Sequence, residues 1–225
     1  MQRELIELTD LRSLATNDNR RRHKKLLLLD MDETLLHAAT LNDIYHAKLY
    51  GPDAEPSFCT NFTDRDQRVE IGVFLRPFLL EMINQVQPYY QIVIFTASEQ
   101  LYADSILDRI DPLYELFSKR LYRDNCIRAY LQQTEQADAK TVFVKDLRIV
   151  ESFGLNEIVI VDNSLLSFSL QPDNGIPISS YFFNPQDQEL RCLANFLVQK
   201  LAHQDDVRHV NQEEFKIQNI INLAS

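Results

Sequence analysis

The chain alternates short apolar runs with polar and amphipathic stretches. Four runs stand out because they contain almost no polar side chains, at residues 26–29, 90–95, 141–144 and 157–161. Runs of this length are typical of strands that are buried on both faces. Because amphipathic segments lie between them, the pattern favours parallel strands joined by right-handed crossovers. We therefore predict an α/β fold with a parallel Rossmann-like sheet flanked by helices.

Three amphipathic segments carry apolar residues at helical spacing. The first follows Pro77, a residue type that suits the first turn of a helix. The stripes comprise Leu79, Met82, Ile83 and Val86; Tyr102, Ile106 and Ile110; and Leu190, Leu193, Ala194, Leu197 and Leu201. Residues 68–74 instead alternate as in a half-buried strand, and we expect them in small β-hairpin insertions beside one edge of the sheet.

The two ends of the chain differ from the predicted core. Residues 1–25 form an N-terminal segment, residues 26–202 the main predicted domain, and residues 203–225 a helical tail that is packed or partly mobile. A short helix is predicted in the first segment from the spacing of Leu5, Leu8, Leu11 and Leu14. Loops are expected at residues 132–140 and 172–177, and an edge strand at residues 178–183.

The first apolar run ends on two carboxylates, Asp30 and Asp32. In an open parallel sheet, ligands bind at the carboxyl ends of the strands. Two carboxylates this close repel each other, and the pair is tolerated with a cation between them or with one member protonated. Both arrangements suit phosphoryl transfer, because Mg²⁺ binds carboxylate oxygens and a protonated aspartate can donate to a leaving oxygen. A D-x-D pair alone is more typical of a capped turn, and it is the rest of the chain that favours a site.

Polar residues also follow the other three runs. Thr96 and Ala97 precede a helix, Lys145 follows the third run, and Asp162 and Asn163 follow the fourth. Right-handed crossovers would bring all four strand ends to one edge, near the expected hairpin insertions. A hydroxyl group and backbone N–H groups before a helix form an anion site. Each residue alone has a simpler interpretation as a cap or an exposed side chain, but their coincidence favours a site.

Composition narrows the class of protein. The 225 residues are 45% hydrophobic and 25% charged, as in a soluble globular domain. The formal net charge of −10 argues against direct nucleic-acid binding. No run reaches the length of a membrane span, and no signal-peptide pattern is present. Cys59, Cys126 and Cys192 are too far apart for a disulfide framework or a zinc site, which indicates a reducing compartment, nuclear or cytoplasmic.

Residues 20–25 read RRRHKK and interrupt this acidic composition. One interpretation is a nuclear import signal or a contact with an anion. The other is a solvated lead-in to the first strand. The sequence leaves both open.

Eight short stretches carry a resemblance to a known family. They are LLLLDMDETLLH (26–37), FLRP (74–77), IVIFTAS (92–98), LYADSILD (101–108), RLYRDNC (120–126), FVKDL (143–147), IVIVDNS (158–164) and DNGIPI (173–178). In this order they resemble the haloacid dehalogenase superfamily and, within it, the small phosphatases that act on the RNA polymerase II C-terminal domain and their relatives. Each stretch is weak alone, whereas eight in the family's order are specific.

The resemblance implies a Mg²⁺-dependent protein serine/threonine phosphatase with an aspartyl-phosphate intermediate. Asp30 would be the nucleophile. Asp32 would be the acid for the leaving oxygen and then the base for water, and would offer its carbonyl to the metal. Thr96 would hold phosphate oxygens, and Lys145 would neutralise charge on the phosphoryl group. The Mg²⁺ ligands, direct or through water, would be Asp30, Asp32, Asp162 and Asn163.

The inserted segments are too short for a cap domain that closes over a metabolite. We therefore expect a phosphorylated protein or peptide as the substrate, either the RNA polymerase II C-terminal domain or another phosphoprotein. Expected substrate-binding residues are Thr96, Ala97, Tyr102, Arg123 and Lys145, with Arg76 and Arg120 as further candidates for the groove or for supporting the phosphate.

Three stretches depart from the family pattern, at residues 38–69, 125–144 and 148–154. They lie where such enzymes shape the substrate groove, so they leave the substrate undefined. Alternatives are a catalytically idle adaptor, as in the mitochondrial import receptor with this fold, a small-molecule phosphatase, or an α/β domain without catalysis. The sequence does not give the oligomeric state.

Overall fold

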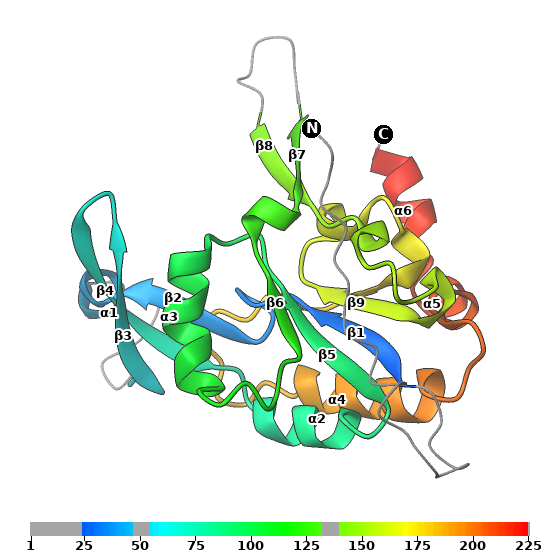
Figure 1. The fold of residues 1–225 in the computed structure, drawn as a ribbon, viewed down its shortest axis with the longest axis horizontal. Helices are drawn as coiled ribbons and strands as arrows, with labels where there is room; N and C mark the ends of the chain where they lie inside the picture. The colour runs from blue at the N-terminus through cyan, green and yellow to red at the C-terminus, as the bar shows by residue number, and fades with distance from the viewer. Residues whose placement is uncertain (1–23, 47–54, 132–139, 225) are drawn as a thin grey trace.

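A five-stranded parallel sheet forms the centre of the protein (Figure 1). The structure, a computed structural model, describes residues 24–46, 55–131 and 140–224. In sheet order the strands are β10 (Gly175–Pro177), β9 (Ile158–Asp162), β1 (Lys25–Leu29), β5 (Tyr90–Phe95) and β6 (Lys119–Leu121). All four pairings are parallel, which confirms the predicted architecture.

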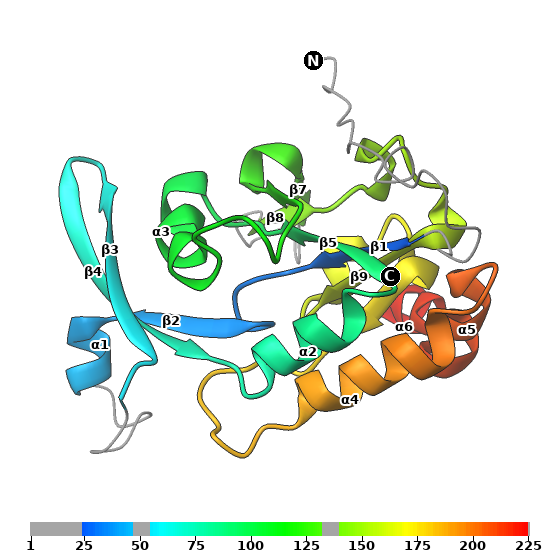
Figure 2. The same ribbon diagram turned by 60° about the horizontal axis from the view of Figure 1, so that its bottom comes forward.

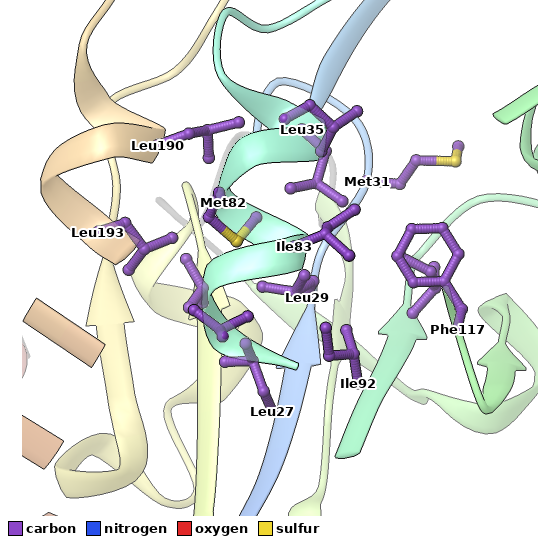
Figure 3. Packing of buried hydrophobic residues seen from close by; sticks show 14 of the residues in the cluster. Leu27, Leu29, Met31, Leu35, Met82, Ile83, Ile92, Phe117, Leu190 and Leu193 are labelled. Atoms are coloured by element: carbon purple, nitrogen blue, oxygen red, sulfur yellow. The ribbon is translucent and has the colours of Figure 1, made fainter. Parts of the chain in front are cut away.

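Strand β1 is buried on both faces, because each of its leucines has 0% exposure. Leu27 and Leu29 point into the larger core, and Leu26 and Leu28 into a second core on the other face. Helices α2 (Leu79–Val86) and α4 (Glu189–Phe196) lie side by side under the larger core (Figure 2). Figure 3 shows their side chains packed around Leu27 and Leu29. Burial of one such leucine contributes about 1.5–3 kcal/mol, so this strand tolerates few substitutions.

The predicted hairpin insertion forms a small antiparallel sheet with the order β2-β4-β3. Its elements are β2 (Leu36–Thr40), α1 (Leu41–His46), β3 (Phe58–Asp64) and β4 (Gln67–Leu75). Strand β3 packs on α3 (Gln100–Ile110), which follows β5. The insertion therefore projects from the side of the molecule that bears α3 (Figures 1 and 2).

A second hairpin consists of β7 (Ile127–Leu131) and β8 (Lys140–Val144), paired antiparallel. The sequence predicted β8 as a strand, but its place in the parallel sheet was wrong. Neighbouring segments pair antiparallel without the long crossover that a parallel pair requires. The connection at residues 132–139 lies outside the described residues. Lys145 nevertheless returns toward the sheet, and its backbone N–H donates to Ser167 O at 2.6 Å.

Two expectations near the C-terminus were also wrong. The predicted loop at 172–177 contains β10, and the predicted edge strand at 178–183 contains no strand. Gly175 allows β10 to lie here, because a Cβ atom at this position would overlap the ring of Phe168. The chain then turns away from the sheet, and the Tyr181 N–H donates to Glu33 O at 2.8 Å.

The C-terminal tail is helical, with α5 (Val207–Phe215) and α6 (Ile217–Ala224). Val207 and Ile217 are buried, so both helices contact the core. A π-helical turn at Leu197–Leu201 continues α4, and 3₁₀ turns occur at Arg123–Asn125, Leu147–Ile149, Leu155–Glu157, Leu165–Phe168 and Pro172–Asn174. The helix predicted around Leu5 to Leu14 and the basic residues 20–23 lie outside the described residues. Within the described ranges, no helix has both the length and the apolar character needed to cross a membrane.

Candidate active site

The turn after β1 places both aspartates at the carboxyl edge of the sheet. The carbonyl oxygen of Met31 accepts hydrogen bonds from three successive N–H groups, those of Thr34, Leu35 and Leu36. Glu33 has φ 55°, a left-handed conformation that non-glycine residues seldom adopt. Its carbonyl is anchored by Tyr181, as described above, so the turn is held from two sides.

A single buried cation joins two strand ends. Lys145 Nζ lies 2.6 Å from Asp30 Oδ1 and 2.6 Å from Asp162 Oδ2. All three side chains are buried, Lys145 completely. Charge-assisted hydrogen bonds of this length are among the stronger ones in proteins. Lys145 thus sits between the carboxylates of β1 and β9, although it comes from neither strand.

Electrostatics explain why this arrangement holds together. Burial lowers the pKa of Lys145, but the charges of Asp30 and Asp162 outweigh burial and leave that pKa above its ordinary value. Burial raises the pKa of Asp30, and the Lys145 ammonium opposes this rise. The paired geometry fits a charged lysine that shares its protons between two carboxylates. One positive charge then faces two negative ones, and Asp32 adds a third nearby carboxylate.

The surplus of oxygen ligands fits a divalent cation. Thr34 Oγ1 lies 3.0 Å from Asp30 Oδ2 and 3.4 Å from Asn163 Oδ1, so these two oxygens converge on one hydroxyl with one proton. Carboxylate and amide oxygens are ligands that Mg²⁺ prefers. In the described part of the chain, no three His, Cys, Asp or Glu side chains gather as a metal group. The oxygens that would fit Mg²⁺ are instead those of the Asp30 and Asp162 carboxylates, the Asn163 amide and the backbone carbonyl of Asp32.

Hydroxyl groups hold both carboxylate oxygens of Asp32. Tyr102 Oη donates to Oδ1 at 2.6 Å, and Ser98 Oγ donates to Oδ2 at 2.7 Å. Burial raises the pKa of Asp32 above its ordinary value, and these two hydrogen bonds lower it in part. Burial, together with the Asp32 charge, raises the pKa of Tyr102, so its hydroxyl remains a proton donor.

The loop after β5 is held from both sides. The Thr96 N–H donates to Leu121 O at 2.9 Å, and the Ser98 N–H donates to Thr96 Oγ1 at 3.1 Å. Thr96 does not cap α3, because the cap position is Glu99. Within the described ranges no hydrogen bond uses the hydroxyl proton of Thr96, so this group can donate to an anion.

Arg123 supports this loop. Its Nε donates to Ala97 O at 2.8 Å, and its Nη1 pairs with Glu99 Oε1 at 2.6 Å. The guanidinium also lies 5.0 Å from the ring centroid of Phe143 in β8. Arg123 therefore links the loop of Thr96 to the hairpin that carries Lys145.

Two of the arginines that were predicted to line the groove form ion pairs within the fold instead. Arg76 is buried against Asp187, and Arg120 pairs with Asp104 and Asp108 of α3. Both guanidinium groups are engaged within the fold, so the structure corrects the expectation that they face a substrate groove. Sequence reasoning assigned no individual role to Thr34 or Ser98. A hydroxyl side chain within a recognised stretch was the available signal for each of them.

Comparison with known proteins relates the chain to a family of phosphatases. Residues 25–208 match the family model described as NLI interacting factor-like phosphatase. CTD small phosphatase-like protein 2 of Dictyostelium discoideum is 34% identical over 198 residues, which cover 88% of this chain and 31% of that protein. CTD small phosphatase-like protein 3 of Caenorhabditis elegans is 32% identical over 199 residues, covering 88% and 62%. The chain thus spans less than two thirds of the length of either relative.

A third relative and a solved structure complete the comparison. CTD nuclear envelope phosphatase 1B of Danio rerio is 31% identical over 207 residues, which cover 91% of this chain and 78% of that protein. The fission yeast RNA polymerase II CTD phosphatase Fcp1, as a variant bound to beryllium fluoride, matches with a TM-score of 0.55 and 18% identity. That match covers 88% of this chain and 51% of the other, and it concerns the fold alone.

Proposed function

The chain belongs to the NLI interacting factor-like phosphatase family, and from this premise we propose that it is a Mg²⁺-dependent protein serine/threonine phosphatase. The observation that carries the proposal is the buried contact of Lys145 with Asp30 and Asp162, at 2.6 Å each. An aspartate whose charge is partly neutralised at a strand end is suited to attack a phosphate monoester. Mg²⁺, when bound by the oxygens around Thr34, supplies further positive charge to the phosphoryl group.

Each side chain of the site has a defined part in the proposed reaction. A carboxylate oxygen of Asp30 attacks phosphorus, a new O–P bond forms, and the bond to the seryl or threonyl oxygen breaks. Asp32, protonated at the start, gives its proton to that leaving oxygen. Water then attacks the aspartyl-phosphate, Asp32 takes a proton from the water, and inorganic phosphate leaves with Asp30 restored. Thr96 and Lys145 bind phosphate oxygens throughout, and the backbone N–H of Ala97 adds a donor.

A phosphorylated protein or peptide is the proposed substrate. The described insertion beside α3 is a three-stranded sheet with one short helix, too small to close over a metabolite. An open site admits a peptide loop, and the relatives include proteins named CTD phosphatases. We propose the RNA polymerase II C-terminal domain or another phosphoprotein as the target, in the nucleus or the cytoplasm. Tyr102 and Arg123 border the site that this peptide would enter.

Hydrolysis of an aryl phosphate tests the chemistry without knowledge of the target. We expect turnover with Mg²⁺, its loss with EDTA, and its loss in Asp30→Asn. Asp64→Asn, which changes an exposed aspartate at the tip of the insertion, is the matched control and should retain full activity. Beryllium fluoride with Mg²⁺ should raise the melting temperature of the wild type but not of Asp30→Asn. A folded, Mg²⁺-loaded protein without turnover would contradict the proposal and favour an adaptor role.

Phosphopeptides then test the substrate class. We expect phosphoserine or phosphothreonine peptides to be hydrolysed with higher kcat/KM than small phosphorylated metabolites. The opposite ranking would favour a small-molecule phosphatase.

A further inference from the structure

Asp32 is the one carboxylate of the site that contacts no cation through a hydrogen bond in the described residues; two hydroxyl groups hold it instead. Tyr102 comes from the first turns of α3, and Ser98 comes from the loop after β5. Each hydroxyl binds a different carboxylate oxygen, so together they fix the plane of the carboxyl group. A carboxyl group held at one oxygen only would be free to rotate about that contact.

The insertion sheet braces Tyr102. The ring of Phe62 on β3 meets the ring of Tyr102 edge to face, with centroids 5.3 Å apart and an interplanar angle of 78°. This is a preferred geometry for an aromatic pair. Thr60, two residues earlier on the same face of β3, donates from Oγ1 to Ser105 O of α3 at 3.0 Å. The strand therefore holds the helix and the ring of Tyr102 together.

We infer that Tyr102 and Ser98 are positioning residues that aim the Asp32 carboxyl group at the leaving oxygen, and that Phe62 of the insertion sheet braces Tyr102. The inference rests on the proposed function and deepens it. It assigns the insertion a part in the chemical step besides any contact with the substrate. It also gives Tyr102 a different role from the substrate contact that the sequence suggested.

The chemistry defines what a misplaced Asp32 would impair. In the first step, the proton of Asp32 moves to the oxygen that leaves phosphorus. An alcohol oxygen needs this proton, because an alkoxide is a poor leaving group. A nitrophenolate leaves without it, since the ring delocalises the charge. A misoriented Asp32 should therefore slow the hydrolysis of substrates with poor leaving groups far more than that of substrates with good ones. A loss of substrate binding should slow both alike.

The experiment is a leaving-group series measured on the chain of 225 residues. kcat/KM is measured for aryl phosphates that range from nitrophenyl to unsubstituted phenyl phosphate, which share the phosphoryl group and differ in the acidity of the phenol. For Tyr102→Phe, we expect the ratio of wild-type to variant rates to grow at least about tenfold from the best to the poorest leaving group. Ser98→Ala removes the other hydroxyl from a different element and should have the same effect. Thermal unfolding establishes that each variant is folded.

Tyr122→Phe is the matched control. The Tyr122 hydroxyl donates to Asp104 Oδ1 of α3 at 2.7 Å, so this variant also removes a tyrosine hydroxyl that binds an aspartate of that neighbourhood. Its rate ratio should stay constant across the series. Phe62→Ala should show a smaller growth of the ratio than Tyr102→Phe, and Phe62→Tyr, which keeps the ring, should restore the wild-type dependence.

The outcomes distinguish a failure of the positioning role from a failure of the proposed phosphatase function. A constant ratio for both Tyr102→Phe and Ser98→Ala would overturn the positioning role. Such a result together with a raised KM for phosphopeptides would make Tyr102 a binding residue. A wild type without turnover on any aryl phosphate would overturn the proposed function and the inference with it.

Discussion

Replacement of Arg76 by methionine should strongly destabilise the protein. The Arg76 side chain is 0% exposed, and its Nε and Nη2 lie 2.9 and 3.0 Å from the two carboxylate oxygens of Asp187. Its Nη1 donates to Thr34 O at 3.0 Å, within the turn after β1. Removal of one partner leaves the Asp187 charge without its counterion in a largely buried place. This type of change costs about 3–5 kcal/mol.

Urea denaturation measures this cost. With a slope of about 2.5 kcal/mol/M, the expected loss lowers the midpoint by roughly 1.2–2 M. Arg68→Met is the control, because Arg68 and Glu70 are 3.5 Å apart and their side chains are 68% and 55% exposed. An exposed pair contributes up to about 1 kcal/mol, so the control should shift the midpoint by less than about 0.4 M.

A double-mutant cycle with Asp187→Asn isolates the pair. Asparagine keeps an oxygen that can accept from the Glu189 N–H, as Asp187 Oδ1 does at 3.0 Å, so this hydrogen bond at the start of α4 is retained. The double variant should be more stable than the sum of the single losses predicts, by about 1–3 kcal/mol. If Arg76→Met behaved like Arg68→Met and instead raised KM for phosphopeptides, the assignment of Arg76 to the fold would be wrong.

Three further predictions concern the cap of α5, strand β10 and the metal. Asp206 is the N-cap residue of α5, and its side chain accepts from the Arg208 N–H. Hydrogen bonds from the Arg208 side chain lower the pKa of Asp206 to about 2. The ionised Asp206 therefore stabilises the folded protein fully above its unfolded pKa near 4, and this contribution is lost as the pH falls toward 2. Asp206→Ala should therefore cost about 1 kcal/mol in urea titrations at pH 7, and clearly less at pH 3. Gly175→Ala should cost about 1–3 kcal/mol by the same assay, because its methyl group would overlap the ring of Phe168, and an unchanged midpoint would contradict the packing described. Mg²⁺ should raise the melting temperature of the wild type, and Asn163→Ala should weaken this rise; an equal rise in both would exclude Asn163 from the metal site.

The central sheet could be predicted because its signals are local. The apolar runs of β1, β5 and β9 are buried on both faces, and neighbours in the sequence suffice to identify them. The family resemblance, confirmed by the match over residues 25–208, followed from short stretches around these strand ends. The roles of the individual site residues remain predictions, since they rest on geometry and await the variants described above.

The arginines were harder to interpret, because a charged side chain does not reveal its partner. Arg76 finds Asp187 at a distance of 111 residues in the sequence. Arg120 finds Asp104 and Asp108 on the helix before it, at positions that become neighbours only once α3 packs beside β6. Nothing in the local pattern distinguishes a buried arginine of this kind from one that binds a phosphate.

Lys145 reaches Asp30 and Asp162 by a backbone route that the sequence did not predict. A parallel strand with its end at the shared edge would have placed the lysine at the site. The structure places it there through an antiparallel hairpin outside the sheet, held by Ser167 and by the two carboxylates. The charge requirement of the site selects a cation at this point, and more than one backbone route can supply it.

The site combines residues at the ends of central strands with residues that two hairpins outside the central sheet hold in place. Asp30 and Asp162 belong to the ends of β1 and β9 in the centre of the sheet, where any shift would disturb two cores. Lys145 arrives by one hairpin, and Tyr102 is braced by another, through Phe62. The two hairpins lie within or beside the stretches that depart from the family pattern. On the proposed function, changes there would alter substrate selection and the orientation of Asp32 together, while the carboxylates that contact Lys145 stay in place.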